Sequence, residues 1–552
     1  MRIFPLAVGF LAAAVFSGSV INGFTFDDPH IVVENPLVTG DGGLVKIFTS
    51  HYWAGEDARS ALYRPLTVAT YWINWRLAGM SPFSYHLVNI VLHGAVTGIF
   101  FLLLKRLAGS PAPACAAAIL FATHPVHTEA VASIVGRAEL LAALFVGLAW
   151  LWRDRTGPAL SLFACGMLAK ENAVILPVLL AVEDLLSARS LRWRRYVPFV
   201  AAAGGFLLLR WQVVGPVIGA LEGPFVHEPT VHRLLTAIAV LGRYVWLMIF
   251  PVTLSADYSF DQIPVVTTPL DPGFLAGAAV MLLGWLLVRG GWRRWPAVAM
   301  GVLVFFIALL PVSNLLFGIG VMMAERLLYL PSLGLCLAAG AAMASGLLAM
   351  GTRRLVAATC LVALAPATVL TLRSVVRTWD WFDQLSLFEA TVRTSPNSAL
   401  AHVNLGSIYQ AMGRLVEAEA SYRRAIAIAP DRPGPYYNLA TVLEKTGRPE
   451  EAIIEYREAL RLDPGNVRAL NNLGKALLAR RRVREAIAML SRAVTIAPEA
   501  PKPAVNLAAA YLQAGDLDRA GRLARQVLAS RPEDEAARRV LAEVERRAAT
   551  AR

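Results

Sequence analysis

The chain has 552 residues, of which 56% are hydrophobic and only 16% are charged, and its formal net charge is +13. Together with a mean hydropathy of +0.53, this composition excludes an ordinary soluble globular protein. Much of the positive charge lies in short clusters between apolar segments, as in Arg192-Trp193-Arg194-Arg195, so it indicates the cytoplasmic turns of a membrane protein and not a nucleic-acid partner.

The first apolar run, residues 3–21, follows Arg2 and lacks a clear A-x-A cleavage site. It therefore predicts an uncleaved first span whose N-terminus is cytoplasmic. The polar loop after it, 22–83, contains the adjacent carboxylates Asp27 and Asp28 near its start. From the residues alone, this pair fits a catalytic base or a turn or helix cap equally well.

Further apolar segments follow, and several are shorter than the ~20 residues of a perpendicular span, which predicts tilted, kinked or half-membrane helices. They lie near 84–104, 112–123, 138–152, 158–169, 172–187, 196–212, 234–250, 272–288, 297–313, 327–349 and 355–372. Basic clusters at 189–195 and 289–294 are both expected in the cytoplasm, so an even number of crossings must separate them. We therefore expect 234–250 to be re-entrant or interfacial, which leaves about 11 spans and puts the C-terminal residues on the same side as Asp27 and Asp28. The four cysteines fall within apolar segments and are predicted to be small core residues.

From about residue 396 the chain becomes charged, rich in alanine and periodic. Five prolines recur every 34 residues, at Pro396, Pro430, Pro464, Pro498 and Pro532. An Asn-Leu-small triplet and a later alanine repeat at the same interval. This is the tetratricopeptide pattern of paired antiparallel helices, so we predict four repeats and a capping helix that form a solenoid with a concave face.

Polar residues near the ends of the apolar segments, on the side expected for Asp27 and Asp28, are candidates for chemistry because such groups are costly near a bilayer. Carboxylates can act as bases, and arginine or lysine can hold a phosphate by charge-assisted hydrogen bonds. The set includes Arg64, His124, His127, Glu129, Arg137, Glu139, Lys170, Glu171, Glu325 and Arg326. His124 and His127 beside Glu129 also fit a metal site, but no third ligand is fixed by the sequence, and a hydrogen-bonded loop is the better interpretation. Glu325 and Arg326 equally fit a simple interfacial ion pair.

Several stretches resemble the signatures of the transmembrane and tetratricopeptide repeat-containing O-mannosyltransferases. The longest reads HPVHTEAVASIVGRAELLAA over 124–143. The others are FDD at 26–28, YRPLT at 63–67, YHLVNIVLH at 85–93, LAKEN at 168–172 and AERLLYLPS at 324–332. The resemblance extends over nearly the whole chain, membrane segments and repeats alike.

The resemblance implies an all-α chain in which a GT-C-like membrane domain precedes the tetratricopeptide solenoid. It also implies a polyprenyl-phosphate-linked sugar as donor, typically dolichyl phosphate mannose, and transfer to Ser/Thr hydroxyls of proteins outside the cytoplasm. By the same resemblance Asp27 and Asp28 occupy the place of the catalytic carboxylate. Candidates for the donor phosphate are Arg64, Arg137, Lys170 and Arg326, and the supporting polar residues are His124, His127, Glu129, Glu139, Glu171 and Glu325. No cofactor is fixed by the sequence, and a divalent metal is compatible with it.

The repeats depart from the family pattern, because only four are legible whereas eukaryotic members usually have more. With the alanine- and arginine-rich composition, this suggests a bacterial relative, for which the carrier is expected to be undecaprenyl phosphate and the sugar need not be mannose. We then expect a multi-pass protein of the bacterial inner membrane with the repeats on the periplasmic side, or of the endoplasmic reticulum with lumenal repeats if the chain is eukaryotic.

One asparagine recurs in each repeat, and the four are Asn404, Asn438, Asn472 and Asn506. Their placement resembles the asparagine ladder with which the O-GlcNAc transferase superhelix holds an extended peptide, since an amide can both donate to C=O and accept from N–H. The alternative is that asparagine serves helix packing at this position. On the first interpretation the repeats bind the protein or peptide acceptor.

We therefore divide the chain into a membrane glycosyltransferase domain (1–375), a linker (376–397), four repeats (398–533) and a capping helix with a tail (534–552). Two other functions remain open at this level. A membrane-anchored scaffold for envelope protein assembly would need only the repeats and no carboxylate pair. A flippase or polymerase for lipid-linked sugars would share the phosphate site but transfer no sugar to protein.

Overall fold

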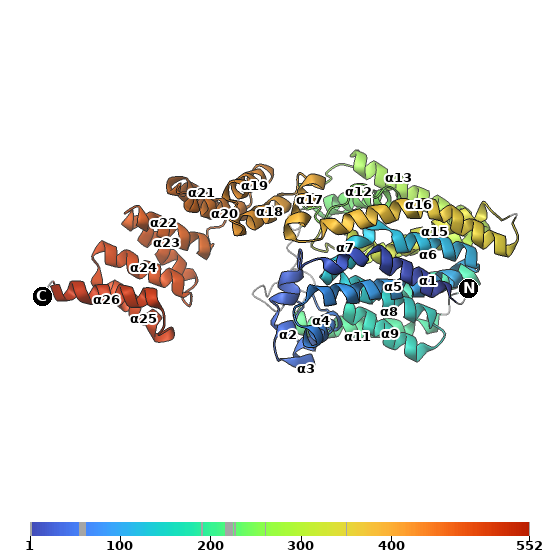
Figure 1. Ribbon diagram of the computed structural model, residues 1–552, viewed down its shortest axis with the longest axis horizontal. Coiled ribbons are helices and arrows are strands. Elements are labelled where there is room, and N and C mark those ends of the chain that lie inside the picture. The colour runs from blue at the N-terminus through green and yellow to red at the C-terminus, as the bar shows by residue number, and fades with distance from the viewer. Residues whose placement is uncertain are drawn as a thin grey trace. The chain divides into compact units, whose positions relative to one another are not determined.

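A computed structural model describes residues 3–53, 62–188, 191, 193–215, 225, 228–259, 261–348 and 350–550. The predicted all-α class is confirmed, since the described residues form helices and turns and no strand. Contacts between Cα atoms divide the chain into two compact units, Met1–Pro396 and Asn397–Arg552, in each of which the helices pack side by side (Figure 1).

The first unit is built from helices α1 to α17, joined by short 3-10 and π turns. Six of them begin with proline, which fits the first turn of a helix because its missing N–H has no partner there in any case. Their bounds are α1 Phe4–Val15, α2 Pro36–Thr39, α3 Gly43–Phe48, α4 Pro65–Ala78, α5 Pro82–Ala108, α6 Pro111–Thr123, α7 Thr128–Ala132, α8 Arg137–Leu151, α9 Thr156–Ala169, α10 Leu176–Ala188, α11 Val197–Val214, α12 Thr230–Ile249, α13 Pro272–Arg294, α14 Pro296–Leu309, α15 Tyr329–Ser345, α16 Thr352–Asp380 and α17 Gln384–Thr394.

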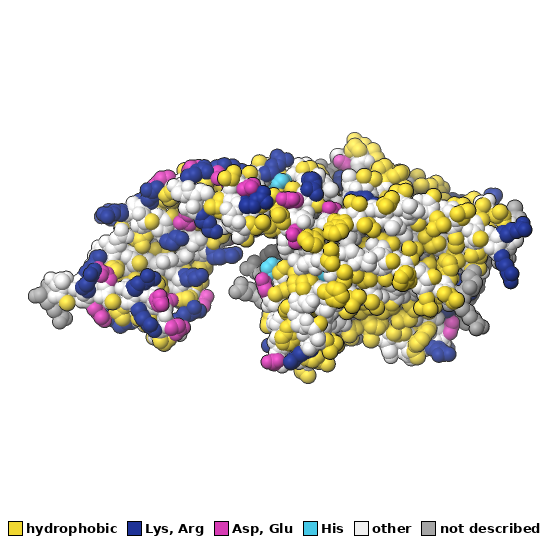
Figure 2. Space-filling model, in the orientation of Figure 1, with side chains coloured by type: hydrophobic (Ala, Val, Ile, Leu, Met, Phe, Trp, Pro, Cys, Tyr) yellow, Lys and Arg dark blue, Asp and Glu magenta, His cyan; other side chains and the backbone are white. Residues whose placement is uncertain are grey.

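The first unit is a multi-pass membrane domain. Seven of its described helices are long and apolar enough to cross a membrane, and four shorter apolar helices accompany them. Figure 2 shows one face of this unit covered by hydrophobic side chains, whereas the surface of the repeats carries interspersed charges of both signs. An apolar exterior of this extent is stable against lipid and not against water.

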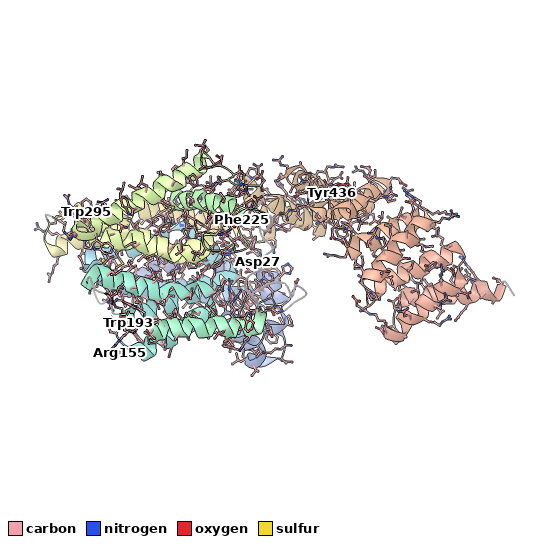
Figure 3. The ribbon with its side chains drawn as sticks, turned by 180° about the vertical axis from the view of Figure 1, so that it is seen from behind. Asp27, Arg155, Trp193, Phe225, Trp295 and Tyr436 are labelled. Carbon is pink, nitrogen blue, oxygen red and sulfur yellow. The ribbon has the colours of Figure 1, made fainter. Side chains whose placement is uncertain are left out.

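The two ends of this bundle differ in chemistry. At one end, which we call the aspartate end, Asn22 donates to the Thr378 carbonyl at 3.4 Å and Ser374 donates to the Thr123 carbonyl at 2.8 Å, so the first loop, α6 and the last turns of α16 meet there. At the opposite, basic end, Arg106 donates to Asp154 at 3.1 Å and Arg195 also pairs with Asp154. Figure 3 shows Asp27 at the first end and Arg155, Trp193 and Trp295 at the other.

Helix α12, which contains the segment expected to be re-entrant or interfacial, contacts the aspartate end near its start and near its end. Near its start Arg233 donates to the Leu315 carbonyl at 3.0 Å, and near its end the Met248 carbonyl lies 3.0 Å from a ring nitrogen of His124. A helix of 20 residues is about 30 Å long, so it cannot reach the same end twice while spanning the bilayer. These contacts favour a helix that lies across the end of the bundle, although its length and composition alone would also fit a span.

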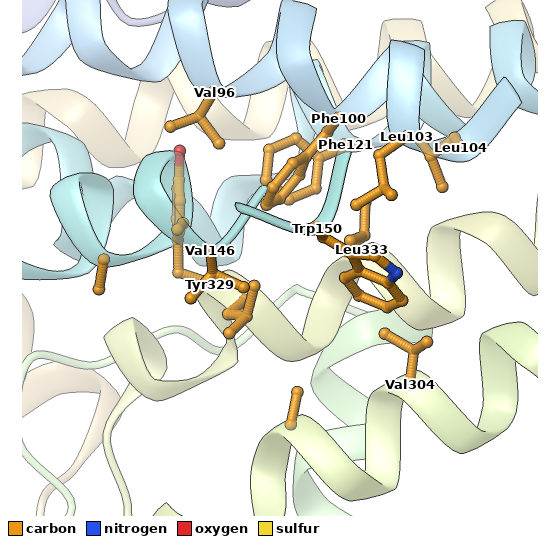
Figure 4. Close-up of a cluster of buried hydrophobic side chains, with 14 of the residues drawn as sticks. Val96, Phe100, Leu103, Leu104, Phe121, Val146, Trp150, Val304, Tyr329 and Leu333 are labelled. Atoms are coloured by element: carbon orange, nitrogen blue, oxygen red, sulfur yellow. The ribbon is translucent and has the colours of Figure 1, made fainter. Parts of the chain in front are cut away.

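The core of the bundle lies between α5, α6, α8, α14 and α15. Phe100, Phe121, Trp150, Tyr329 and Leu333 are among its buried side chains (Figure 4). Glycines allow the closest helix contacts, as small residues do in membrane helices generally. A Cβ atom on Gly301 of α14 would lie 2.5 Å from the carbonyl oxygen of Gly334 on α15.

The residues predicted as a linker, 376–397, are mostly helical. α16 continues to Asp380, and after a short turn α17 runs from Gln384 to Thr394. α17 is stabilised by burial of Leu387, Phe388 and Ala390 on its apolar face within the first unit. The Asp383 side chain also caps its N-terminus by accepting from the Ser386 N–H.

The second unit consists of four antiparallel helix pairs followed by one more helix. The five prolines spaced by 34 residues each stand two residues after a helix, Pro396 after α17 and the other four after the second helix of a pair, where a proline cannot continue the helix. The glycine that ends the first triplet is also explained, because a Cβ on Gly406 would lie 2.7 Å from the Tyr422 ring. The bounds are α18 Ala399–Ala411, α19 Leu415–Ile428, α20 Pro433–Lys445, α21 Pro449–Leu462, α22 Val467–Ala479, α23 Val483–Ile496, α24 Pro501–Ala514, α25 Leu517–Ser530 and α26 Glu535–Thr550.

Candidate active site

The buried Asp28 carboxylate accepts hydrogen bonds from two separate segments of the backbone. One oxygen accepts from the Thr25 N–H at 3.0 Å, and the other accepts from the Val135 N–H at 2.9 Å and from the Ser133 hydroxyl at 3.4 Å. Burial raises the pKa of Asp28 to about 7, against the backbone hydrogen bonds that lower it. Both oxygens are thus occupied in joining the first loop to the segment before α8.

Asp27 differs from its neighbour. Its side chain is only half-buried, and within the described residues it makes no hydrogen bond or ion pair. Burial raises the pKa of Asp27, the charge of Arg326 lowers it, and the charges of Glu129 and Asp257 raise it further. Asp27 is therefore a carboxylate with free acceptor oxygens and a raised pKa, which suits a base.

Arg326 is the cation whose charge acts most strongly on Asp27. Its guanidinium pairs with Glu129, and its backbone N–H donates to the same carboxylate at 2.8 Å. The pair joins α7 to the 3-10 turn Glu325–Leu328. The Arg326 side chain keeps 24% of its surface exposed, so it is accessible from outside the packed core.

A second charged group comes from the LAKEN stretch. Arg64 donates to both oxygens of Glu171, at 2.9 and 2.6 Å, and Lys170 pairs with Glu139, which also accepts from Asn172 at 3.2 Å. Burial raises the pKa of the Glu171 carboxyl, but the Arg64 guanidinium outweighs this and holds the pKa at about 2. Glu171 is therefore ionised, and Arg64 and Lys170 both carry carboxylate partners.

Arg137 has no exposed surface and belongs to the framework. It donates to the Asn89 side chain at 2.9 Å, to the Asn74 side chain at 3.2 Å and to the Tyr85 carbonyl at 3.0 Å. Its guanidinium also lies over the Tyr71 ring, with 4.8 Å to the ring centroid. The structure thus places Arg137 apart from the accessible cations.

The two histidines of the longest motif are buried and hydrogen-bonded. A ring nitrogen of His124 lies 3.0 Å from the Met248 carbonyl, and one of His127 lies 2.9 Å from the Ser332 hydroxyl. Among the residues that the structure describes, no group of three or more His, Cys, Asp or Glu side chains is arranged to hold a metal ion.

Sequence reasoning missed the loop between α12 and α13. There the Ser255 N–H and the Tyr258 hydroxyl donate to Glu325, the hydroxyl at 2.7 Å, and Arg377 near the end of α16 lies 3.9 Å from the same carboxylate. Asp257 in this loop acts on Asp27 by its charge. The signal was available, because α12 as an interfacial helix would return this polar loop to the aspartate end.

In the repeats, each of the four asparagines lies half-buried on the first helix of its pair. Asn472 donates to the Tyr437 hydroxyl at 3.2 Å and Asn506 donates to Asn471 at 2.7 Å, so both bridge neighbouring first helices. Asn404 and Asn438 form no side-chain hydrogen bond within the described residues. A cavity of about 260 Å³ adjoins Asn438. Its other lining residues are Ser407, Gln410, Ala411, Tyr422 and Lys445.

Comparison with known proteins places these residues in context. The family model described as "Protein O-mannosyl-transferase TMTC, DUF1736" matches residues 215–285, and tetratricopeptide repeat models match 397–465, 437–501 and 477–544. The human protein O-mannosyl-transferase TMTC1 is 32% identical over 490 residues, covering 76% of this chain and 54% of that protein. Human TMTC3 is 29% identical over 508 residues, covering 77% of this chain and 55% of that protein.

The chain thus spans little more than half the length of these curated relatives. Among solved structures, the crystal structure of MamA matches with a TM-score of 0.25 and 19% identity, covering 26% of this chain and 79% of that one.

Proposed function

The chain is homologous to the TMTC family of protein O-mannosyl-transferases, and from that premise we propose that it is an integral membrane glycosyltransferase of the GT-C type. It takes mannose or another hexose from a polyprenyl-phosphate carrier. The acceptors are Ser/Thr hydroxyls of proteins on the non-cytoplasmic face. In this proposal the lipid-linked sugar and the protein acceptor are the two partners.

Asp27 is the base in this proposal, and one observation carries the assignment. Of the two adjacent carboxylates, only Asp27 has oxygens free of protein partners within the described residues, whereas Asp28 is occupied by Thr25, Ser133 and Val135. Asp27 accepts the proton of the attacking hydroxyl as the new bond forms to the anomeric carbon. The bond from that carbon to the phosphate oxygen breaks at the same time, and the attack from the opposite side inverts the anomeric configuration.

Arg326 is the cation that we assign to the donor phosphate. It is accessible, and its charge lowers the pKa of Asp27 more than any other charge does, which supports a place for the donor phosphate near the base. Arg64 and Lys170 supply further positive charge, balanced by Glu171 and Glu139 until the donor binds. We assign Arg137 to the framework, since its side chain is fully buried and its hydrogen-bond partners are uncharged side-chain and backbone oxygens.

The aspartate end faces away from the cytoplasm in this proposal. Arg106, Arg153 and Arg195 gather at the opposite end, and the positive-inside rule assigns that end to the cytoplasm. α16 finishes at the aspartate end, so the chain enters the repeats from the same side as Asp27. The carrier and the bacterial inner membrane, or the endoplasmic reticulum for a eukaryotic chain, stay predictions.

The repeats hold the acceptor through its backbone. Of the four repeat asparagines, Asn404 and Asn438 make no side-chain hydrogen bond to any residue that the structure describes, and the cavity beside Asn438 is lined largely by polar residues. Because Asn472 and Asn506 already bridge helices, we place the peptide chiefly on the first two repeats.

Transfer by the purified full-length protein in detergent tests the proposal. Polyprenyl-phosphate mannose and polyprenyl-phosphate glucose, each with a labelled sugar, are offered together with a Ser/Thr-rich protein, and the product is analysed by mass spectrometry. We expect one hexose on Ser or Thr with one of the two donors. A protein that moves the lipid across vesicles or extends lipid-linked chains, and leaves the acceptor unmodified, contradicts the proposal.

A further inference from the structure

Phe26, immediately before Asp27, has a strained backbone. Its φ is 54°, in the left-handed region that residues other than glycine, asparagine and aspartate rarely adopt. Such a conformation persists only where its surroundings hold it, and it is found most often at functional sites. The residue that sets the direction of Asp27 is therefore held by something outside its own loop.

Contacts from α17 and the turn before it hold Phe26. The Phe26 N–H donates to the side-chain oxygen of Gln384 at 3.3 Å. The Phe26 ring stacks on Phe388, with 6.0 Å between centroids and 26° between planes, and meets Trp381 edge-on at 6.4 Å. Trp381 and Phe388 are themselves buried, so the Phe26 ring packs against side chains that are fixed by their surroundings.

The same segment also binds the residues before Phe26. The Gly23 N–H donates to the Phe382 carbonyl at 2.8 Å, and the Asn22 amide donates to the Thr378 carbonyl at 3.4 Å. Asn22, Gly23 and Phe26 thus each have a partner between residues 378 and 388. Asp27 has no side-chain partner of its own in the described structure, so its carboxylate is placed by this backbone alone.

We propose that Gln384, Trp381 and Phe388 are positioning residues, which hold Phe26 in its left-handed conformation and so fix the Asp27 carboxylate for proton transfer. The inference rests on the proposed role of Asp27 as base. It also gives α17 a function beyond that of a connector, because only residues 395–398 separate this helix from α18 of the first repeat. In this proposal α17, the last helix before the repeats in the chain, is also the helix that positions the base.

The kinetic test removes the hydrogen bond while keeping the size of the side chain. We expect Gln384→Leu to lower kcat roughly 10- to 100-fold with little change in KM for the donor, as displacement of a catalytic group by about 1 Å does. Gln384→Glu still offers an oxygen to the Phe26 N–H. At a pH at which carboxylates are ionised, its kcat should therefore be close to the wild-type value and well above that of Gln384→Leu. Phe388→Leu, which keeps an apolar side chain and loses the stacking, should lower kcat in the same way.

The matched control is Arg393→Gln, an exposed residue on the same helix, which should transfer sugar at the wild-type rate. All variants are compared at equal amounts of monodisperse protein. Wild-type kcat in both Gln384→Leu and Phe388→Leu would overturn the proposal, as would an equal loss in Gln384→Glu and Gln384→Leu.

A second readout does not depend on sugar transfer. In a background with the four native cysteines replaced by alanine, Asp27→Cys is labelled with a maleimide, with and without Gln384→Leu. We expect the labelling rate to change several-fold when the hydrogen bond is lost, because the loop then samples other conformations. An unchanged rate overturns the positioning role, whereas a wild-type protein that transfers no sugar from any donor overturns the proposed function and leaves this readout intact.

Discussion

We expect Asp27→Asn to abolish sugar transfer while leaving the fold intact. Loss of a general base typically lowers kcat by roughly 10²- to 10⁴-fold, which corresponds to about 3 to 5 kcal/mol in activation free energy. The Asp27 side chain makes no hydrogen bond within the described residues, so its replacement should change the free energy of unfolding by less than about 0.5 kcal/mol.

Asp28→Asn should have the opposite profile. The Asp28 carboxylate accepts from two backbone N–H groups through two different oxygens, and asparagine offers one oxygen and one NH₂ group in their place. One buried N–H, of Thr25 or Val135, then loses its acceptor, at a cost of about 1 to 3 kcal/mol in stability. Activity per folded molecule should fall much less than in Asp27→Asn.

The assay pairs initial rates of transfer from a labelled polyprenyl-phosphate sugar with chemical unfolding of the same preparations in detergent. Wild-type rates in Asp27→Asn would refute the assignment of the base. If Asp27→Asn unfolded more easily than Asp28→Asn, the distinction between a free and a structural carboxylate would be wrong, even if both variants were inactive.

Three further predictions follow from the charged and polar contacts. Lys170→Met should cost about 3 to 5 kcal/mol in stability because it leaves Glu139 buried without its cation, and the double variant with Glu139→Gln should regain much of this in a double-mutant cycle; additive losses would contradict it. The double variant Asn404→Ala, Asn438→Ala should raise KM for a peptide acceptor about 10-fold and leave kcat unchanged, because each lost hydrogen bond contributes about 0.5 to 1.5 kcal/mol to binding. A lower kcat at constant KM would contradict acceptor binding at these asparagines. Because the pKa of Asp28 is raised from 3.8 to about 7, the folded state binds more protons than the unfolded state between these values, so stability should fall as the pH rises from 4 to 7, and Asp28→Asn should flatten that slope in thermal unfolding.

The helical architecture could be predicted from the sequence because its signals are local. A 34-residue period and runs of apolar residues depend only on neighbours along the chain, and the structure has helices at the predicted apolar segments. Residues 376–397, between the last apolar segment and the first repeat, are predicted to be a linker. Helix α17 within them is stabilised by burial of Leu387 and Phe388 against distant residues, which no local pattern reveals.

The roles within the site depend on contacts across the chain. The residues next to Asp27 and Asp28 in the sequence do not distinguish their roles. The two carboxylates differ because the Val135 N–H, 107 residues away from Asp28, donates to Asp28 and not to Asp27. From the sequence, Arg137 has the positive charge expected of a phosphate ligand and is expected on the same side of the membrane as Asp27 and Asp28. Asn74 and Asn89 surround it with uncharged acceptors, and nothing in the spacing of these three residues indicates that they meet.

The effect of the Arg326 charge on the pKa of Asp27 connects donor binding to the strength of the base. In the free protein the guanidinium lowers the pKa of Asp27. A donor phosphate bound to Arg326 would offset that charge and add a negative one, so the pKa of Asp27 should rise in the complex, which makes the carboxylate a better proton acceptor. In the pH profile of kcat, the acidic limb reports the pKa of Asp27 in the complex, and in the profile of kcat/KM it reports the pKa in the free protein. The acidic limb of kcat should therefore lie at higher pH than that of kcat/KM. Arg326→Gln should move the limb of kcat/KM upward and bring the two together. Coincident limbs in the wild type would show that the phosphate binds elsewhere than on Arg326.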